Sequence, residues 1–139
     1  MKNFLLFPHI LIIIAITSGI LLASVTLQYF TASTNSDGIL IEWKTIEEGG
    51  TVKFEIERSA VTPDNFIYIN TVNATGNNSY YSYQDNSVDK GDNKSTSIYY
   101  YRLKCVQQNA SYTYTYSISV IHAVSGIRST WGSIKAIFR

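Results

Sequence analysis

The nine residues Ile98-Tyr-Tyr-Tyr-Arg-Leu-Lys-Cys-Val106 decide the fold class of this chain. Successive side chains of a β-strand point to opposite faces, so Tyr99, Tyr101 and Leu103 share one face, together with Cys105. Basic residues occupy the other face. Aromatic and β-branched residues suit a pleated, half-buried surface. The stretch therefore predicts the central strand of a sheet, with its aromatic face turned toward a core.

Alternating segments on both sides of this strand predict its partners. In residues 39–45 the alternation places Trp43 at the centre of the core, and in residues 52–59 it places Val52, Phe54 and Ile56 inside. Turns rich in Asn, Asp and Gly separate the segments. The expected strands are residues 24–33, 39–45, 52–59, 66–72, 80–84, 98–106 and 111–123. The expected core residues are Trp43, Phe54, Ile56, Tyr99, Tyr101 and Leu103.

The last of these segments alternates without a break, which predicts one continuous strand paired with residues 98–106 through a hairpin. Its residues on one register are Tyr112, Tyr114, Tyr116, Ile118 and Val120. Seven short strands joined by turns indicate an all-β fold of two packed antiparallel sheets, a seven-stranded sandwich over residues 24–123.

Charge and cysteine content narrow the function. The 139 residues include 11 Lys and Arg and 10 Asp and Glu. This balance lacks the excess of positive charge that is typical of nucleic-acid-binding proteins. Cys105 is the single cysteine, so no intrachain disulfide can form, and its register predicts a buried thiol. We expect no nucleic-acid partner.

The sequence also offers little for catalysis or metal binding. Neither His9 nor His122 has a second donor at ligand spacing. No nucleophile-elbow motif and no glycine-rich phosphate loop occur. Lysines lie among the acidic residues of the loop at 85–97, so we interpret this loop as solvated rather than calcium-binding. Its oxygen-bearing residues are Asp85, Asp89, Asp92 and Asn93. We expect a non-enzymatic protein without a metal or cofactor.

Three ordered motifs carry a family resemblance. They are Ile41-Glu-Trp43, Phe54-Glu-Ile-Glu-Arg-Ser59 and Tyr99-Tyr-Tyr-Arg-Leu-Lys104, followed by a strand rich in Tyr and Ser. Together they resemble fibronectin type III-like modules, closest to those in exported proteins of the Bacteroidetes, Chlorobi and Ignavibacteria group. The resemblance covers about residues 25–123. It implies an immunoglobulin-like sandwich that serves as a spacer, adhesive or interaction module, and it transfers no catalytic residue.

The resemblance also implies two structural roles. Trp43 would be the core tryptophan of the second strand, and Tyr101 would be a corner tyrosine whose hydroxyl bonds to the backbone. Such modules usually lie in long multidomain proteins, whereas this chain carries one module, which favours a stand-alone subunit.

The first 23 residues are predicted to form a hydrophobic helix, either a secretory signal peptide or a transmembrane anchor. Lys2 is followed by no charged residue until Asp37, and residues 4–25 are almost wholly apolar. As a helix, these 22 residues would span about 33 Å, close to the thickness of a hydrocarbon core. Both interpretations predict export to the cell envelope or the extracellular face, anchored or secreted.

Residues 124–139 form a separate basic tail. Its apolar residues follow helical spacing, which predicts a short amphipathic helix. They are Trp131, Ile134, Ile137 and Phe138. The ending resembles a terminus found in exported proteins of the same bacterial group. Three interpretations stay open: packing on the sandwich, docking to a membrane or a partner, and a sorting tag.

Two functions follow from these features. The first is a structural or interaction module, either a membrane-tethered accessory subunit or a surface assembly subunit, with a protein partner or with itself. The second is a carbohydrate- or ligand-binding module that uses exposed tyrosines. The candidate interaction residues are Tyr100, Tyr112, Tyr114, Trp131, Ile134 and Phe138.

Overall fold

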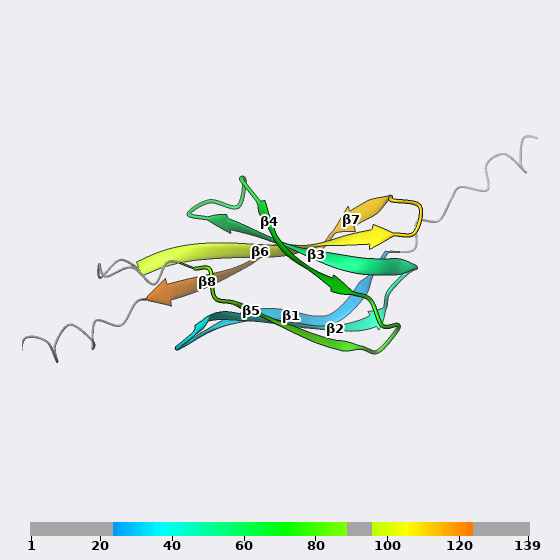
Figure 1. Cartoon of the computed structure of the whole chain (residues 1–139), viewed down its shortest axis with the longest axis horizontal. Coiled ribbons are helices and arrows are strands. Elements are labelled where there is room, and N and C mark those ends of the chain that lie inside the picture. The colour runs from blue at the N-terminus through cyan, green and yellow to red at the C-terminus, as the bar shows by residue number, and fades with distance from the viewer. Residues whose placement is uncertain (1–23, 89–95, 124–139) are drawn as a thin grey trace, which may run out of the picture.

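The computed structural model describes residues 24–88 and 96–123 (Figure 1). The expected N-terminal helix over residues 1–23 and the expected tail over residues 124–139 lie outside this part of the chain. Among the residues described, no helix is both long and apolar enough to cross a membrane.

The described residues form eight β-strands and no helix, and every strand pair is antiparallel. This confirms the all-β antiparallel class. The strands are β1 (Thr26–Asn35), β2 (Gly38–Glu47), β3 (Thr51–Ala60), β4 (Ile67–Asn73), β5 (Tyr80–Asp85), β6 (Thr96–Gln107), β7 (Tyr112–Tyr114) and β8 (Ile118–Ala123).

These strands make two sheets that face each other as two layers (Figure 1). The first sheet has the order β1-β2-β5. The second has the order β4-β3-β6-β7, and β8 also pairs with β6. The chain therefore crosses between the sheets after β2, after β4 and after β5. β6, the strand that the sequence places at the centre, pairs with three others.

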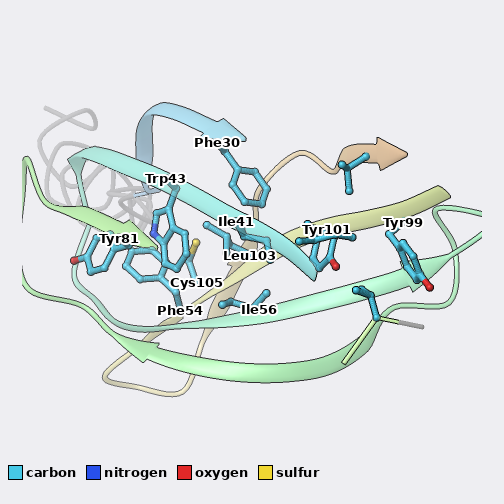
Figure 2. Close-up of a cluster of buried hydrophobic side chains, with 13 residues drawn as sticks. Phe30, Ile41, Trp43, Phe54, Ile56, Tyr81, Tyr99, Tyr101, Leu103 and Cys105 are labelled. Atoms are coloured by element: carbon cyan, nitrogen blue, oxygen red, sulfur yellow. The ribbon is translucent and has the colours of Figure 1, made fainter. Parts of the chain in front are cut away.

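The core lies between the sheets and is built mainly from the inward faces of β2, β3 and β6, with Phe30 of β1, Tyr81 of β5 and Val120 of β8 (Figure 2). Trp43 stacks on Tyr81, with ring centroids 5.1 Å apart, and meets Phe54 edge-on at 5.7 Å. Burying one large apolar side chain contributes about 1.5–3 kcal/mol. All six expected core residues are buried: Trp43, Phe54, Ile56, Tyr99, Tyr101 and Leu103.

Val52 does not join this core, and its predicted inward orientation is wrong. The register between β3 and β6 shifts between Thr51 and Lys53, which gives β3 one extra residue. Such a bulge interrupts the alternation of side chains. Thr51 takes the buried position, while Val52 is 44% exposed.

The predicted continuous strand at the end of the module is also wrong, because residues 115–117 separate β7 from β8. At the break, the backbone N–H of Leu103 donates to Thr115 Oγ1 (3.0 Å) instead of to a backbone carbonyl. Beyond the break, the ring of Tyr116 packs edge-on against Phe30 of β1, with ring centroids 6.0 Å apart. The break thus places an aromatic ring beside the opposite sheet.

Candidate interaction surface

The outer face of the second sheet carries a group of rings and cations. Arg102 and Lys104 point outward from β6, and the strand register places Tyr114 opposite Lys104. Five residues make up this group, here called the aromatic–cation surface: Phe66, Arg102, Lys104, Tyr112 and Tyr114. The rings of Tyr112 and Tyr114 lie 5.4 Å apart in an edge-on arrangement.

Arg102 is held between two rings of this surface. Its guanidinium carbon lies 4.1 Å from the ring centre of Phe66 and 3.9 Å from that of Tyr114. Its Nη2 atom lies 2.7 Å from Glu57 Oε2. A planar guanidinium can stack on rings and bind a carboxylate at the same time. These contacts fix the side chain in one orientation.

Lys104 is held in a similar way by a ring and an acid. Its Nζ atom lies 4.6 Å from the ring centre of Tyr112 and 3.0 Å from Glu55 Oε2. Glu55 also accepts a hydrogen bond from Lys53 (2.7 Å). Hydrogen bonds from Lys53 and Lys104 lower the pKa of Glu55, and the bond to Glu55 raises the pKa of Lys104. The charges of this face are therefore paired.

The structure brings two of the candidate interaction residues together and separates a third. Tyr112 and Tyr114 are 54% and 45% exposed and adjacent. Tyr100 is half-buried and pairs with Ser59 and Ser119, four residues along β6 from Lys104, or about 13 Å. The remaining three candidates lie outside the described residues: Trp131, Ile134 and Phe138.

Sequence reasoning missed Phe66 and Arg102. A hairpin register between residues 98–106 and 111–123 would have placed Tyr114 beside the basic residues of β6. Phe66 precedes β4, which joins the sheet on the far side of β3, and only the sheet order brings its ring to Arg102.

A buried ionic cluster joins the two sheets behind this surface. Asp85 at the end of β5 is fully buried, contrary to the prediction that it lies in a solvated loop. Its Oδ2 atom accepts hydrogen bonds from Arg58 Nη1 (2.7 Å) and from the hydroxyl of Tyr101 (2.9 Å). The predicted bond from Tyr101 to the backbone is therefore replaced by one to a carboxylate. The other oxygen-bearing residues of the loop at 85–97 lie outside the described part of the chain. They are Asp89, Asp92 and Asn93.

Opposing effects set the pKa of Asp85. Burial by itself raises it, but hydrogen bonds from Ser87 and Tyr101 and the charge of Arg58 outweigh burial, so the pKa lies below its ordinary value. Burial and the charge of Asp85 raise the pKa of Tyr101. Asp85 is therefore stabilised in its charged form by the groups that donate hydrogen bonds to it.

A second buried carboxylate, Glu48, forms hydrogen bonds with the loop between β4 and β5. It accepts hydrogen bonds from the hydroxyl of Tyr81 and from the backbone N–H of Gly76 (2.9 Å). Its own N–H donates to Asn77 Oδ1 (2.8 Å). Like Asp85, Glu48 uses its oxygens to hold the chain in place.

The one cysteine and the one histidine in the described part of the chain are both buried. Burial raises the pKa of the Cys105 thiol to about 12. His122 is buried, and its Nδ1 atom has no hydrogen-bond partner. Within residues 24–88 and 96–123, no three His, Cys, Asp or Glu residues are grouped as metal ligands would be.

Comparison of the chain with protein-family models, with curated proteins and with solved structures found no match.

Proposed function

We propose that this chain is a non-enzymatic, fibronectin type III-like contact module of the cell envelope or extracellular face. It acts as a membrane-tethered accessory subunit or as a surface assembly subunit, and its aromatic–cation surface binds a protein partner. The observation that carries the proposal is Arg102, held between Phe66 and Tyr114 on an exposed sheet face.

The fold supports the module assignment. A three-stranded sheet packs against a larger antiparallel sheet around a buried tryptophan. This arrangement is in keeping with the sandwich architecture that immunoglobulin and fibronectin type III domains share. The apolar stretch at residues 4–25 supports export, as a signal or an anchor.

The chemistry of the surface favours a protein as partner. Tyrosine and arginine are enriched among the residues that dominate binding energy in protein interfaces. Ordering such side chains on binding costs about 0.5–1.5 kcal/mol each. Here stacking and ion pairs already hold Arg102 and Lys104, which lowers that cost.

A carbohydrate ligand is the second candidate, because Tyr112 and Tyr114 are exposed neighbours. Their rings are inclined by 68°, however, and a cation lies over one face of each ring. Two rings in this arrangement offer no common flat platform to a sugar. A protein surface, which can contact rings and charges together, fits better.

Photo-crosslinking in the producing cell tests the proposal. A photoreactive phenylalanine replaces Tyr114 in the full chain, and the matched control replaces Tyr80, which is similarly exposed on the other sheet. We expect a discrete adduct with a different protein from position 114 and no adduct with that protein from position 80. A polysaccharide adduct would favour the second candidate, and no adduct from position 114 would contradict both.

A further inference from the structure

We propose that the open edge of β5 pairs with β5 of a second copy, which joins two sandwiches through one continuous sheet. The inference deepens the proposed function, on which it rests, because it names a partner and a place for assembly. An unpaired strand edge is a template for another strand unless something blocks it.

The other sheet edges in the described part of the chain carry such blocks. β1 has register shifts between Thr26 and Tyr29, and the hydroxyl of Thr34 donates to the carbonyl of Ile121 in β8 (3.0 Å). β1 and β8 therefore close one side of the sandwich together. β4 has a bulge, since the register skips Ile69, and β7 is only three residues long. Bulges and short strands both hinder edge pairing.

β5 lacks these blocks. It pairs with β2 over six consecutive residues, from Tyr80 to Asp85, without a register shift. Within the described residues β2 is its only strand neighbour. The strand contains no Lys, Arg, Glu or Pro, and its one charged residue, Asp85, is buried against Arg58.

The sequence of β5 favours a second copy as its partner. In a two-fold pairing centred on Ser82, Ser82 meets its own equivalent, Tyr81 meets Tyr83 and Tyr80 meets Gln84. Each of these pairs lies on one face, as antiparallel pairing requires. No like charges meet, and cross-strand aromatic pairs stabilise a sheet. A closed two-fold interface of this kind uses the same patch on both copies.

A charge placed at the two-fold position provides the test. Ser82 is exposed, so Ser82→Lys leaves the monomer folded but sets two lysines opposite each other in the pair. Thr31→Lys is the matched control, because Thr31 and Ser82 both lie opposite Glu42, on the two sides of β2. The full chain is studied by analytical ultracentrifugation under one detergent condition.

We expect wild type and Thr31→Lys to sediment as dimers, and Ser82→Lys to show half that protein mass. Mixing Ser82→Lys with Ser82→Glu should restore a dimer that contains one copy of each. A monomeric wild type, or a dimer that survives Ser82→Lys, would overturn the inference. The photo-adduct from position 114 should persist in the Ser82→Lys variant, so failure of edge pairing and failure of the proposed function are distinguishable.

Discussion

Asp85 shows how single residues hold this sandwich together. It ends a strand of the first sheet and binds Arg58 and Tyr101, which belong to the second. The alternation of the sequence correctly places Tyr101 inside. It gives no sign that Asp85 is buried, because an Asp before a polar loop reads as a turn residue. Only the packing of the two sheets brings the charged groups together.

Asp85→Ala should therefore destabilise the protein strongly. The change leaves Arg58, whose side chain is 14% exposed, without its carboxylate. Removing one partner of a buried ion pair costs about 3–5 kcal/mol. Tyr101→Phe removes one hydrogen bond and should cost about 1–3 kcal/mol. Urea unfolding measures both, and equal, small losses for the two variants would contradict the assigned roles.

Asp85 should also make stability depend on acid. Its folded pKa lies below its ordinary value of 3.8, so the folded state binds fewer protons than the unfolded state. The stabilisation is complete above that ordinary value and is lost as the pH falls through the folded pKa. In the Asp85→Asn variant, the free energy of unfolding should therefore fall less steeply at acidic pH than in wild type, as unfolding measurements across pH would show. If the variant shows the same pH dependence as wild type, other carboxylates cause the loss of stability in acid.

At the scale of the strands, alternation predicts β2, β3 and β6 well where each pairs in a regular register. It fails where the register changes. The bulge at Thr51 turns Val52 outward, and the break after Tyr114 divides the final strand. Both depend on how the segment pairs with another strand, β6, so the alternation within the segment itself cannot reveal them.

Gly38 at the start of β2 gives a prediction at this scale. Its φ is +140°, and an added Cβ would lie 2.1 Å from the carbonyl oxygen of Asp85. Gly50, with φ +77°, has open space around it and serves as the matched control. Gly50→Ala should cost about 1–2 kcal/mol from backbone strain alone.

Gly38→Ala adds a clash with the Asp85 carbonyl to the strain of a positive φ, so it should cost clearly more than Gly50→Ala in urea unfolding. Equal losses would show that β2 and β5 can move apart at this point.

For the whole molecule, the sequence predicts the layers but only part of the candidate site. Tyr112 and Tyr114 can be chosen as tyrosines that share one register of the last segment. Phe66 and Arg102 cannot, because their contact depends on the order β4-β3-β6-β7. Tyr100 shares the face but lies apart from the pair along β6.

Because Cys105 is buried in the core, the folded protein should react slowly with thiol reagents. Cys105 is 2% exposed, and burial raises its pKa to about 12. The thiolate is the reactive form, so labelling by a thiol reagent at neutral pH should be very slow in the folded chain. In denaturant the same thiol should react completely. Rapid labelling of the folded protein would show that the two sheets open readily.

The most direct test of a contact function is the native size of the chain isolated from its producing cell in mild detergent. Wild type should migrate in a complex larger than its own dimer, with a second protein present. The double variant Tyr112→Ala/Tyr114→Ala should stay folded and migrate without that protein. Its free energy of unfolding should fall by about 1.5–3.5 kcal/mol, because two cation–π contacts and one ring pair are lost. If wild type and the folded double variant have the same size and composition, the aromatic–cation surface does not bind the partner.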